Sequence, residues 1–322
     1  MRKEITPLVR TLVMAAAGCV LLPVAEASEG LSATTNTGLT YVGNARCSSC
    51  HIASSNQFVH TVHANAFKLN PKNESDKYGC EKCHGPGSEH IAAKDPGNPA
   101  NRGAIISFTR EWGTPVEKQN SMCMNCHQGG QRNLWAGSVH AMNRLSCSDC
   151  HNPMANLSGS GLLKNASISE TCFSCHRQQR GEFAKRSHMP VPEGKMTCVD
   201  CHNPHGSATR PLLKGDSVNE TCVSCHTEKR GPFIWEHAPV RENCLNCHNA
   251  HGSNNEKLLQ VSRPLNCQRC HGNTQHPSTL YNASQSLGGG AAVNSRVLGR
   301  SCQNCHPQVH GSNHPAGARF QR

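Results

Sequence analysis

The sequence predicts a mostly irregular fold with short α-helices and almost no sheet. Only 4% of the 322 residues are aromatic and 36% are hydrophobic, whereas ordinary globular domains contain about 45–50% apolar residues. The chain also contains 28 glycines and 18 prolines, which interrupt regular elements. A polypeptide of this composition cannot fill an ordinary core, so we expect bound groups to supply most of the buried apolar surface.

The cysteines identify the expected group, because a Cys-x-x-Cys-His motif occurs ten times and uses all but one of the 21 cysteines. Two thiols three residues apart can each form a thioether to one porphyrin, and the next imidazole can bind its iron. Zinc ribbons also use Cys-x-x-Cys pairs, but they do not require histidine after every second cysteine. The motifs predict a multihaem cytochrome c, with short α-helices wrapped around a linear chain of ten covalently attached haems c.

The ten motifs define two sets of haem-binding residues. The predicted thioether cysteines are Cys47, Cys50, Cys80, Cys83, Cys123, Cys126, Cys147, Cys150, Cys172, Cys175, Cys198, Cys201, Cys222, Cys225, Cys244, Cys247, Cys267, Cys270, Cys302 and Cys305. The predicted proximal ligands are His51, His84, His127, His151, His176, His202, His226, His248, His271 and His306.

Eleven further histidines lie outside the motifs, enough to give each of ten irons a second axial ligand. A haem with two axial histidines mainly transfers electrons, whereas one with an open position can bind and transform small molecules. The predicted distal candidates are His63, His90, His140, His188, His205, His237, His251, His276, His310 and His314, which leaves His60 as the spare. His205 and His251 follow motif histidines by only three residues, so each should bind a neighbouring iron and draw adjacent haems together.

Met154 is an additional distal candidate. The segment Asn152-Pro153-Met154 directly follows its motif, as Asn203-Pro204-His205 does, but has a methionine where the second segment has a histidine. The alternative role of this methionine is to fill a gap against a porphyrin. If Met154 binds iron, it should bind that of a neighbouring haem, and that haem should have the highest potential because methionine favours ferrous iron.

The amino terminus predicts export. Arg2 and Lys3 precede a largely apolar run at residues 8–24, and Ala25-Glu26-Ala27 resembles a cleavage site, so residues 1–27 are interpreted as a signal peptide. A lipoprotein signal ending at Cys19 is the alternative, although the apolar run continues beyond this cysteine.

The remaining chain divides by motif spacing. We expect a flexible lead-in at residues 28–46, a decahaem domain at residues 47–314 and a mobile tail at residues 315–322. The decahaem domain should contain two loosely defined pentahaem halves with a boundary near residues 177–197. A glycine-rich stretch at residues 284–294 is expected to be a flexible insertion.

The net charge of +11 does not predict a nucleic-acid partner. The basic residues are scattered, and each ferric haem adds about one negative charge once its two propionates ionise. The oxidised holoprotein should therefore be close to neutral.

The sequence resembles the periplasmic decahaem cytochromes of the MtrA, PioA, MtoA and DmsE type. The resemblance is densest at Glu228-Lys229-Arg230-Gly231-Pro232, Trp235-Glu236-His237-Ala238-Pro239-Val240, Glu242-Asn243-Cys244 and the segment from Gln308 to Pro315. It implies a periplasmic protein seated in an outer-membrane β-barrel porin, with periplasmic or inner-membrane cytochromes and an extracellular multihaem cytochrome as partners. The implied function is electron transfer between periplasmic carriers and extracellular iron(II), iron(III) or other donors and acceptors.

Two alternatives compete with this function. A soluble periplasmic shuttle donating to a terminal reductase remains open, because DmsE and NrfB-like relatives belong to that class. A nitrite or hydroxylamine enzyme would need an open iron position, yet the sequence contains no Cys-x-x-Cys-Lys motif and enough histidines to fill every site. We therefore predict an electron carrier without a catalytic haem.

The motifs generate a direct prediction about covalent composition. The exported protein should carry ten haems and no disulfide, because twenty cysteines form thioethers and the remaining one leaves with the signal peptide. Intact mass spectrometry measures both properties. A mass short of ten haems, or a mature chain that retains Cys19, would contradict the prediction.

Overall fold

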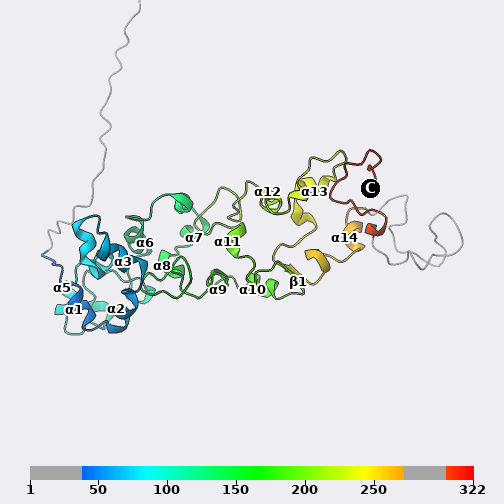
Figure 1. Cartoon of the computed structure of the whole chain (residues 1–322). Helices are drawn as coiled ribbons and strands as arrows, with labels where there is room; N and C mark the ends of the chain where they lie inside the picture. The colour runs from blue at the N-terminus through cyan, green and yellow to red at the C-terminus, as the bar shows by residue number, and fades with distance from the viewer. Residues whose placement is uncertain (1–37, 272–301) are drawn as a thin grey trace, which may run out of the picture. The chain divides into compact units, whose positions relative to one another are not determined.

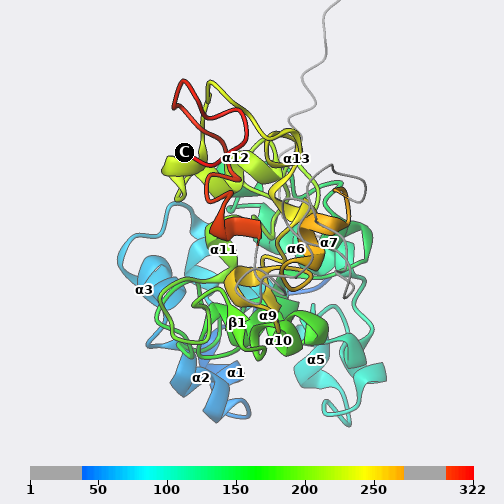
Figure 2. The same ribbon diagram turned by 90° about the vertical axis from the view of Figure 1, so that its right-hand side faces the viewer.

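Short helices joined by long irregular segments make up the described chain (Figures 1 and 2). The structure is a computed structural model that describes residues 38–271 and 302–322. The signal peptide, most of the lead-in, His276 and the insertion at residues 284–294 lie outside the described residues. Residues from Thr40 onward belong to one unit by their contacts.

The α-helices are short, and most lie at or beside a motif. They are α1 (Asn44–Ser48), α2 (Ile52–Phe58), α3 (Val62–Leu69), α4 (Cys80–His84), α5 (Ser88–Ala92), α6 (Val116–Met124), α7 (Val139–Met142), α8 (Cys147–Cys150), α9 (Ile168–Phe173), α10 (Arg177–Phe183), α11 (Cys198–Cys201), α12 (Val218–Val223), α13 (Ala238–Glu242) and α14 (Leu265–Gln268).

Single 3₁₀ turns occupy many of the remaining connections. They are η1 (Glu74–Tyr78), η2 (Pro99–Asn101), η3 (Arg110–Trp112), η4 (Gly130–Arg132), η5 (Thr227–Lys229), η6 (Cys244–Asn246), η7 (Glu256–Leu258) and η8 (Cys302–Asn304). Within the described residues the only sheet joins β1 (Ser187–His188) to β2 (Gly252–Ser253), antiparallel. The predicted fold class, irregular chain with short helices and almost no sheet, is confirmed.

The motif itself explains why helical turns form at these positions. The N–H of the motif histidine donates to the carbonyl of the first cysteine four residues earlier, as from His51 to Cys47 and from His127 to Cys123, both at 2.9 Å. In a helix, residues i, i+3 and i+4 share one face. One hydrogen-bonded turn therefore presents both thiols and the imidazole to the same side, where one porphyrin can receive all three.

Polar caps stabilise several of these turns. Asp149 accepts a hydrogen bond of 2.8 Å from the N–H of Ser146, and Asp200 accepts one of 2.6 Å from the N–H of Thr197. Both pairs form capping boxes at the starts of α8 and α11, an arrangement that satisfies N–H groups left unpaired at a helix start. The sequence of the motif region thus encodes its own helix start.

A second local unit follows three of the motifs. The N–H groups of Asn152, Asn203 and Asn249 donate to the carbonyls of residues 162, 212 and 258, at 2.6, 2.8 and 2.7 Å. Isolated β-bridges join His151 to Leu163, His202 to Leu213 and His248 to Leu259. The chain therefore turns back in the same way after motifs four, six and eight.

Few apolar side chains are buried in the polypeptide alone. Among the described residues, the buried hydrophobic ones are Ile106, Ala155, Phe183, Val191, Leu213, Val223 and Leu259. A set this small cannot offset the conformational entropy lost when such a chain is ordered, so the fold depends on what the motifs bind. No helix among the described residues is both long enough and apolar enough to cross a membrane.

The carboxyl-terminal tail at residues 315–322 makes several contacts with earlier parts of the chain. The carbonyl of Phe320 accepts a hydrogen bond of 2.9 Å from the N–H of Gln308, and the ring of Phe320 lies 5.3 Å from that of His237. The carbonyl of Arg319 lies 2.6 Å from Nδ1 of His306. The tail thus contacts two histidines that its own sequence does not reveal, and its mobility stays a prediction.

Glu81 is a buried carboxylate whose removal should loosen the amino-terminal end of the described chain. Its side-chain oxygens accept hydrogen bonds from the N–H groups of Val42, Gly43 and Gly87 at 2.8–2.9 Å, and the residue is 3% exposed. We expect Glu81→Ala to destabilise this region by about 2–4 kcal/mol, because hydrogen bonds to charged groups are the strong ones. Native-state hydrogen exchange at residues 42, 43 and 87 measures the change.

The matched control for Glu81 is Glu117→Ala. The Glu117 side chain is 70% exposed and lies 3.8 Å from Arg144, so its loss should change stability by less than about 0.5 kcal/mol. Equal protection losses in the two variants would show that the Glu81 carboxylate does not hold this region together.

Candidate haem sites

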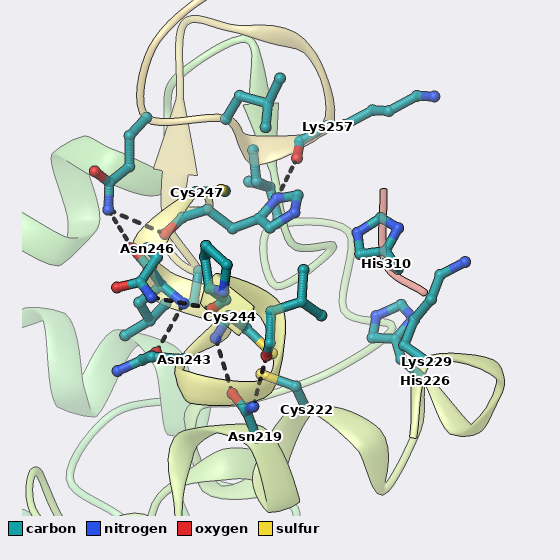
Figure 3. Close-up of a pocket in the computed structure, with 18 of the residues that line it drawn as sticks. Asn219, Cys222, His226, Lys229, Asn243, Cys244, Asn246, Cys247, Lys257 and His310 are labelled. Atoms are coloured by element: carbon teal, nitrogen blue, oxygen red, sulfur yellow. Dashed lines mark hydrogen bonds between the residues drawn. The ribbon is translucent and has the colours of Figure 1, made fainter. Parts of the chain in front are cut away.

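A continuous cavity of about 3000 Å³ is lined by the fifth to tenth motifs. Ordinary small-molecule pockets measure about 300–1000 Å³, so this cavity has room for several large groups. Motif cysteines and histidines line it together, and Figure 3 shows Cys222, Cys244, His226 and His310 in one part of it. The residues present therefore fit several porphyrins side by side rather than one ligand.

Thiols from consecutive motifs lie close together, and in each neighbouring pair one thiol contributes to a shifted pKa of the other. The nine neighbouring pairs are Cys47 and Cys80, Cys83 and Cys126, Cys123 and Cys147, Cys150 and Cys175, Cys172 and Cys198, Cys201 and Cys225, Cys222 and Cys244, Cys247 and Cys267, and Cys267 and Cys302. Each motif is thereby adjacent to the one before it and the one after it. The described sites form an unbroken succession in chain order.

Direct thiol–thiol hydrogen bonds are strongest within certain pairs. The hydrogen bond from Cys172 lowers the pKa of Cys198 to about 7 and raises that of Cys172 itself, and Cys222 has the same effect on Cys244. Asn219 fixes the second pair, because its Oδ1 accepts a hydrogen bond of 2.8 Å from the N–H of Cys244 (Figure 3). Each such contact joins the first cysteines of an odd-numbered motif and the even-numbered motif that follows.

Seven proximal histidines face a second histidine ring at a nearly constant distance. The pairs are His51 and His90 at 6.2 Å between ring centroids, His127 and His63 at 5.8 Å, His176 and His140 at 6.1 Å, His151 and His205 at 6.0 Å, His202 and His251 at 6.2 Å, His271 and His237 at 6.2 Å, and His248 and His310 at 6.2 Å.

This distance fits one metal atom between two imidazoles. With each metal–nitrogen bond about 2 Å long, the ring centroids on opposite sides of one metal lie about 6 Å apart. The Nε2 atoms of His63 and His127 are 3.5 Å apart, close to the separation that two such bonds span. This spacing would allow the two rings of each pair to bind one iron.

Carbonyl groups fix the orientation of several of the rings. Nδ1 lies 2.8 Å from the Ile106 carbonyl at His84, 2.6 Å from the Gly161 carbonyl at His151 and 2.8 Å from the Pro204 carbonyl at His140. A donor bond from Nδ1 leaves Nε2 unprotonated and free to bind metal. The backbone thus selects the tautomer that an axial ligand requires.

Burial also favours the neutral form of the imidazole rings. It lowers the pKa of His63, His90 and His202, chiefly by removing the charged form from water. Neutral imidazole is the form that binds metal, so these rings are ready to bind iron near neutral pH. Among the described residues, no group of three or more His, Cys, Asp or Glu side chains is arranged as a site for a bare metal ion.

His251 has a different neighbour from the other rings. Its Nδ1 lies 3.2 Å from a carboxylate oxygen of Glu182 at the end of α10, and the Glu182 side chain is only 16% exposed. A carboxylate on the second nitrogen raises the basicity of an imidazole ligand. No pattern in the sequence predicts this contact, because 69 residues separate the partners.

The structure leaves some predicted distal candidates outside the ring pairs. Nε2 of His188 in β1 lies 3.0 Å from Glu193, and this hydrogen bond raises the pKa of His188. His314 accepts a bond of 3.1 Å from the N–H of Ala316. Among the described residues, neither His84 nor His226 has a second histidine ring at the 6 Å spacing.

Comparison with known proteins identifies the family. Residues 140–181, 188–231 and 237–276 match the model of a doubled CXXCH motif, and residues 80–158 match the model of a cytochrome c-type protein NrfB-like. The chain is 46% identical to the multiheme cytochrome MtrA of Shewanella baltica over 243 residues, 76% of this chain and 70% of the relative. It is 29% identical to the cytochrome c-type protein NrfB of Escherichia coli O6:H1 over 51% of this chain and 79% of the relative. The chain belongs to the MtrA family of multihaem c-type cytochromes, which are electron carriers rather than enzymes.

Proposed function

We propose that this protein is a wire of ten haems c that carries electrons through an outer-membrane barrel. In this proposal it connects periplasmic or inner-membrane carriers with extracellular donors or acceptors such as iron(II) and iron(III). Bound haem c supplies one-electron exchange at its iron. The polypeptide attaches each haem, orders the sites and selects their axial ligands.

The adjacency of consecutive motifs is the observation that carries the proposal. A thioether sulfur sits at the edge of a porphyrin, so two neighbouring sulfurs such as those of Cys123 and Cys147 bring two porphyrin edges together. The same relation recurs from Cys47 through to Cys302 without a missing step. An uninterrupted order of sites supports conduction along the chain rather than separate reactions at isolated centres.

Axial ligation supports transfer over catalysis. We infer that the seven histidine pairs fill both axial positions of their irons, so a substrate finds no open position there. The third, fifth and ninth motifs follow a rule in which the second ring comes from the segment between the two preceding motifs, as His140 does for His176 and His237 for His271. By this rule His188 would serve the iron of His226, for which its Nε2 would have to exchange its hydrogen bond to Glu193 for the metal.

The barrel is inferred from the family resemblance and from the nature of the chain. Irregular backbone carries many polar groups, which can lie at membrane depth only where other protein covers them. A closed porin-like partner would supply that cover. The proposed location is the periplasmic side of the outer membrane, with the protein inserted into its barrel partner after export.

A soluble shuttle that donates to a terminal reductase is the second candidate. The match of residues 80–158 to the NrfB-like model favours it. Both candidates use the same succession of haems and differ in whether a barrel binds the protein.

The ligand arrangement predicts the spin state of the oxidised protein. Two strong axial ligands keep iron low-spin, so we expect almost no high-spin signal at neutral pH and no appreciable turnover of nitrite. Electron paramagnetic resonance and a nitrite consumption assay measure these properties. A large high-spin signal, or rapid nitrite reduction, would favour the multihaem enzyme.

Reconstitution tests the wire directly. Liposomes should contain reduced viologen dye and carry the barrel alone, the cytochrome alone or both together, with iron(III) outside. We expect the dye to be oxidised only when both proteins are present. Liposomes that contain a high-potential oxidant such as ferricyanide in place of the dye, with iron(II) outside, test the other direction. Cytochrome that fails to bind the barrel and leaves the dye reduced would support the shuttle.

Removing one site supplies the control for this experiment. Cys222→Ala combined with Cys225→Ala should prevent covalent attachment at the seventh motif, in the middle of the succession. Dye oxidation should fall at least tenfold while the variant still co-purifies with the barrel. Unchanged conduction would mean that electrons do not pass through the succession of sites.

A further inference from the structure

The segments after the even-numbered motifs share a detailed geometry that extends to Met154. The N–H groups of Met154, His205 and His251 donate to the side-chain oxygen of the asparagine two residues earlier, at 3.1, 3.2 and 3.2 Å. The backbone before and after these residues also makes corresponding hydrogen bonds in the three segments. Met154 therefore occupies the same structural position as two of the paired histidines.

The histidines at this position follow a consistent rule. His205, which follows motif six, faces the proximal His151 of motif four, and His251, which follows motif eight, faces the proximal His202 of motif six. His310, which follows motif ten, faces His248 of motif eight. Motifs six, eight and ten thus each provide the second ring for the preceding even-numbered motif.

The same rule predicts that the residue at this position after motif four provides the second ligand for the iron of the preceding even-numbered motif, motif two, whose proximal histidine is His84. Among the described residues no second histidine ring lies about 6 Å from His84, which contacts Phe108 edge-on at 5.2 Å instead. Nδ1 of His84 lies 2.8 Å from the Ile106 carbonyl, so Nε2 remains available for iron. We propose that the sulfur of Met154 is the second axial ligand of the iron bound by His84.

Contacts between motif four and the surroundings of His84 support the assignment independently of the rule. Ser148, in the helix of motif four, donates a hydrogen bond of 3.0 Å to the carbonyl of Phe108, whose ring lies against His84. Arg110, two residues further on, forms an ion pair of 2.9 Å with Asp149 of the same motif. Motif four is therefore held beside the second haem site.

The residue after Met154 also differs from its counterparts. Glycine follows His205, His251 and His310, and a Cβ at each glycine would come within 2.2 Å of another atom. Ala155 replaces glycine after Met154 and is 2% exposed. The structure has room for the methyl group of Ala155. The segment after motif four is therefore packed differently from the other three, and this packing accepts a methionine in place of the histidine.

Ligation by Met154 has a functional consequence. Methionine stabilises ferrous iron relative to a second histidine, so the second haem should have the highest potential in the chain. An electron would occupy this site most readily, near the amino-terminal end of the succession. This inference concerns ligation and does not depend on whether a barrel surrounds the protein.

Spectroscopy of the holoprotein tests the proposal without an activity assay. Near-infrared magnetic circular dichroism separates His/Met from bis-His haems, and we expect one His/Met band in the wild type. Met154→His should convert this band to a bis-His band and lower the highest potential in a redox titration. Met154→Leu should abolish the band and leave one haem without its distal ligand. Only bis-His bands in the wild type, or a band that survives both substitutions, would overturn the proposal.

Two controls locate the ligand and its iron. Met196 is half-buried like Met154, and Met196→Leu should leave the His/Met band intact; loss of the band would overturn the choice of Met154. Phe108→Leu removes the ring beside His84 and should shift the potential of the His/Met haem. Phe183→Leu, beside His251 at 5.5 Å, should leave that potential unchanged. An unshifted potential in Phe108→Leu, or an equal shift in both variants, would overturn the assignment to His84.

Discussion

The structure depends on one hydrogen-bonded turn, repeated at each motif, that turns two thiols and an imidazole to one side. In the fifth motif the N–H of His176 reaches the carbonyl of Cys172 at 2.9 Å, and the turn is complete within the motif. Such a turn is too short to be stable alone, because helix nucleation fixes several residues for one bond. Covalent attachment at both cysteines therefore supplies the constraint that a hydrophobic core supplies in ordinary domains.

The local nature of this turn explains which features of the fold and of the haem sites could be predicted from the sequence. Motif spacing is local, so the thioether cysteines, the proximal histidines and the class of fold followed from residues within five positions of each other. The pairing of His248 with His310 joins motif eight to the segment after motif ten, and the sequence offered only a set of candidates for it. Contacts such as that of Glu182 with His251 join distant residues by packing, and no pattern in the chain marked them.

Hydrogen bonding at the outer nitrogen of each imidazole differs along the succession. A carbonyl oxygen lies beside Nδ1 of His202 at 2.9 Å, whereas a carboxylate lies beside Nδ1 of His251 on the other side of the same proposed iron. A more basic ligand favours ferric iron, so the sixth site should have a lower potential than a site held by two carbonyl-bonded rings. The polypeptide can thus set different potentials while every site keeps the same attachment.

The binding of one motif's iron by a histidine that follows another motif also affects the stability of the fold. When His205 binds the iron of His151 and His251 binds that of His202, each iron joins two segments about fifty residues apart in the chain. Removing one haem would then free a proximal segment and a distal segment together, and would loosen the neighbouring sites as well. Order in the succession and stability of the fold therefore have the same origin, since the bonds that place the irons in sequence also hold the chain around them.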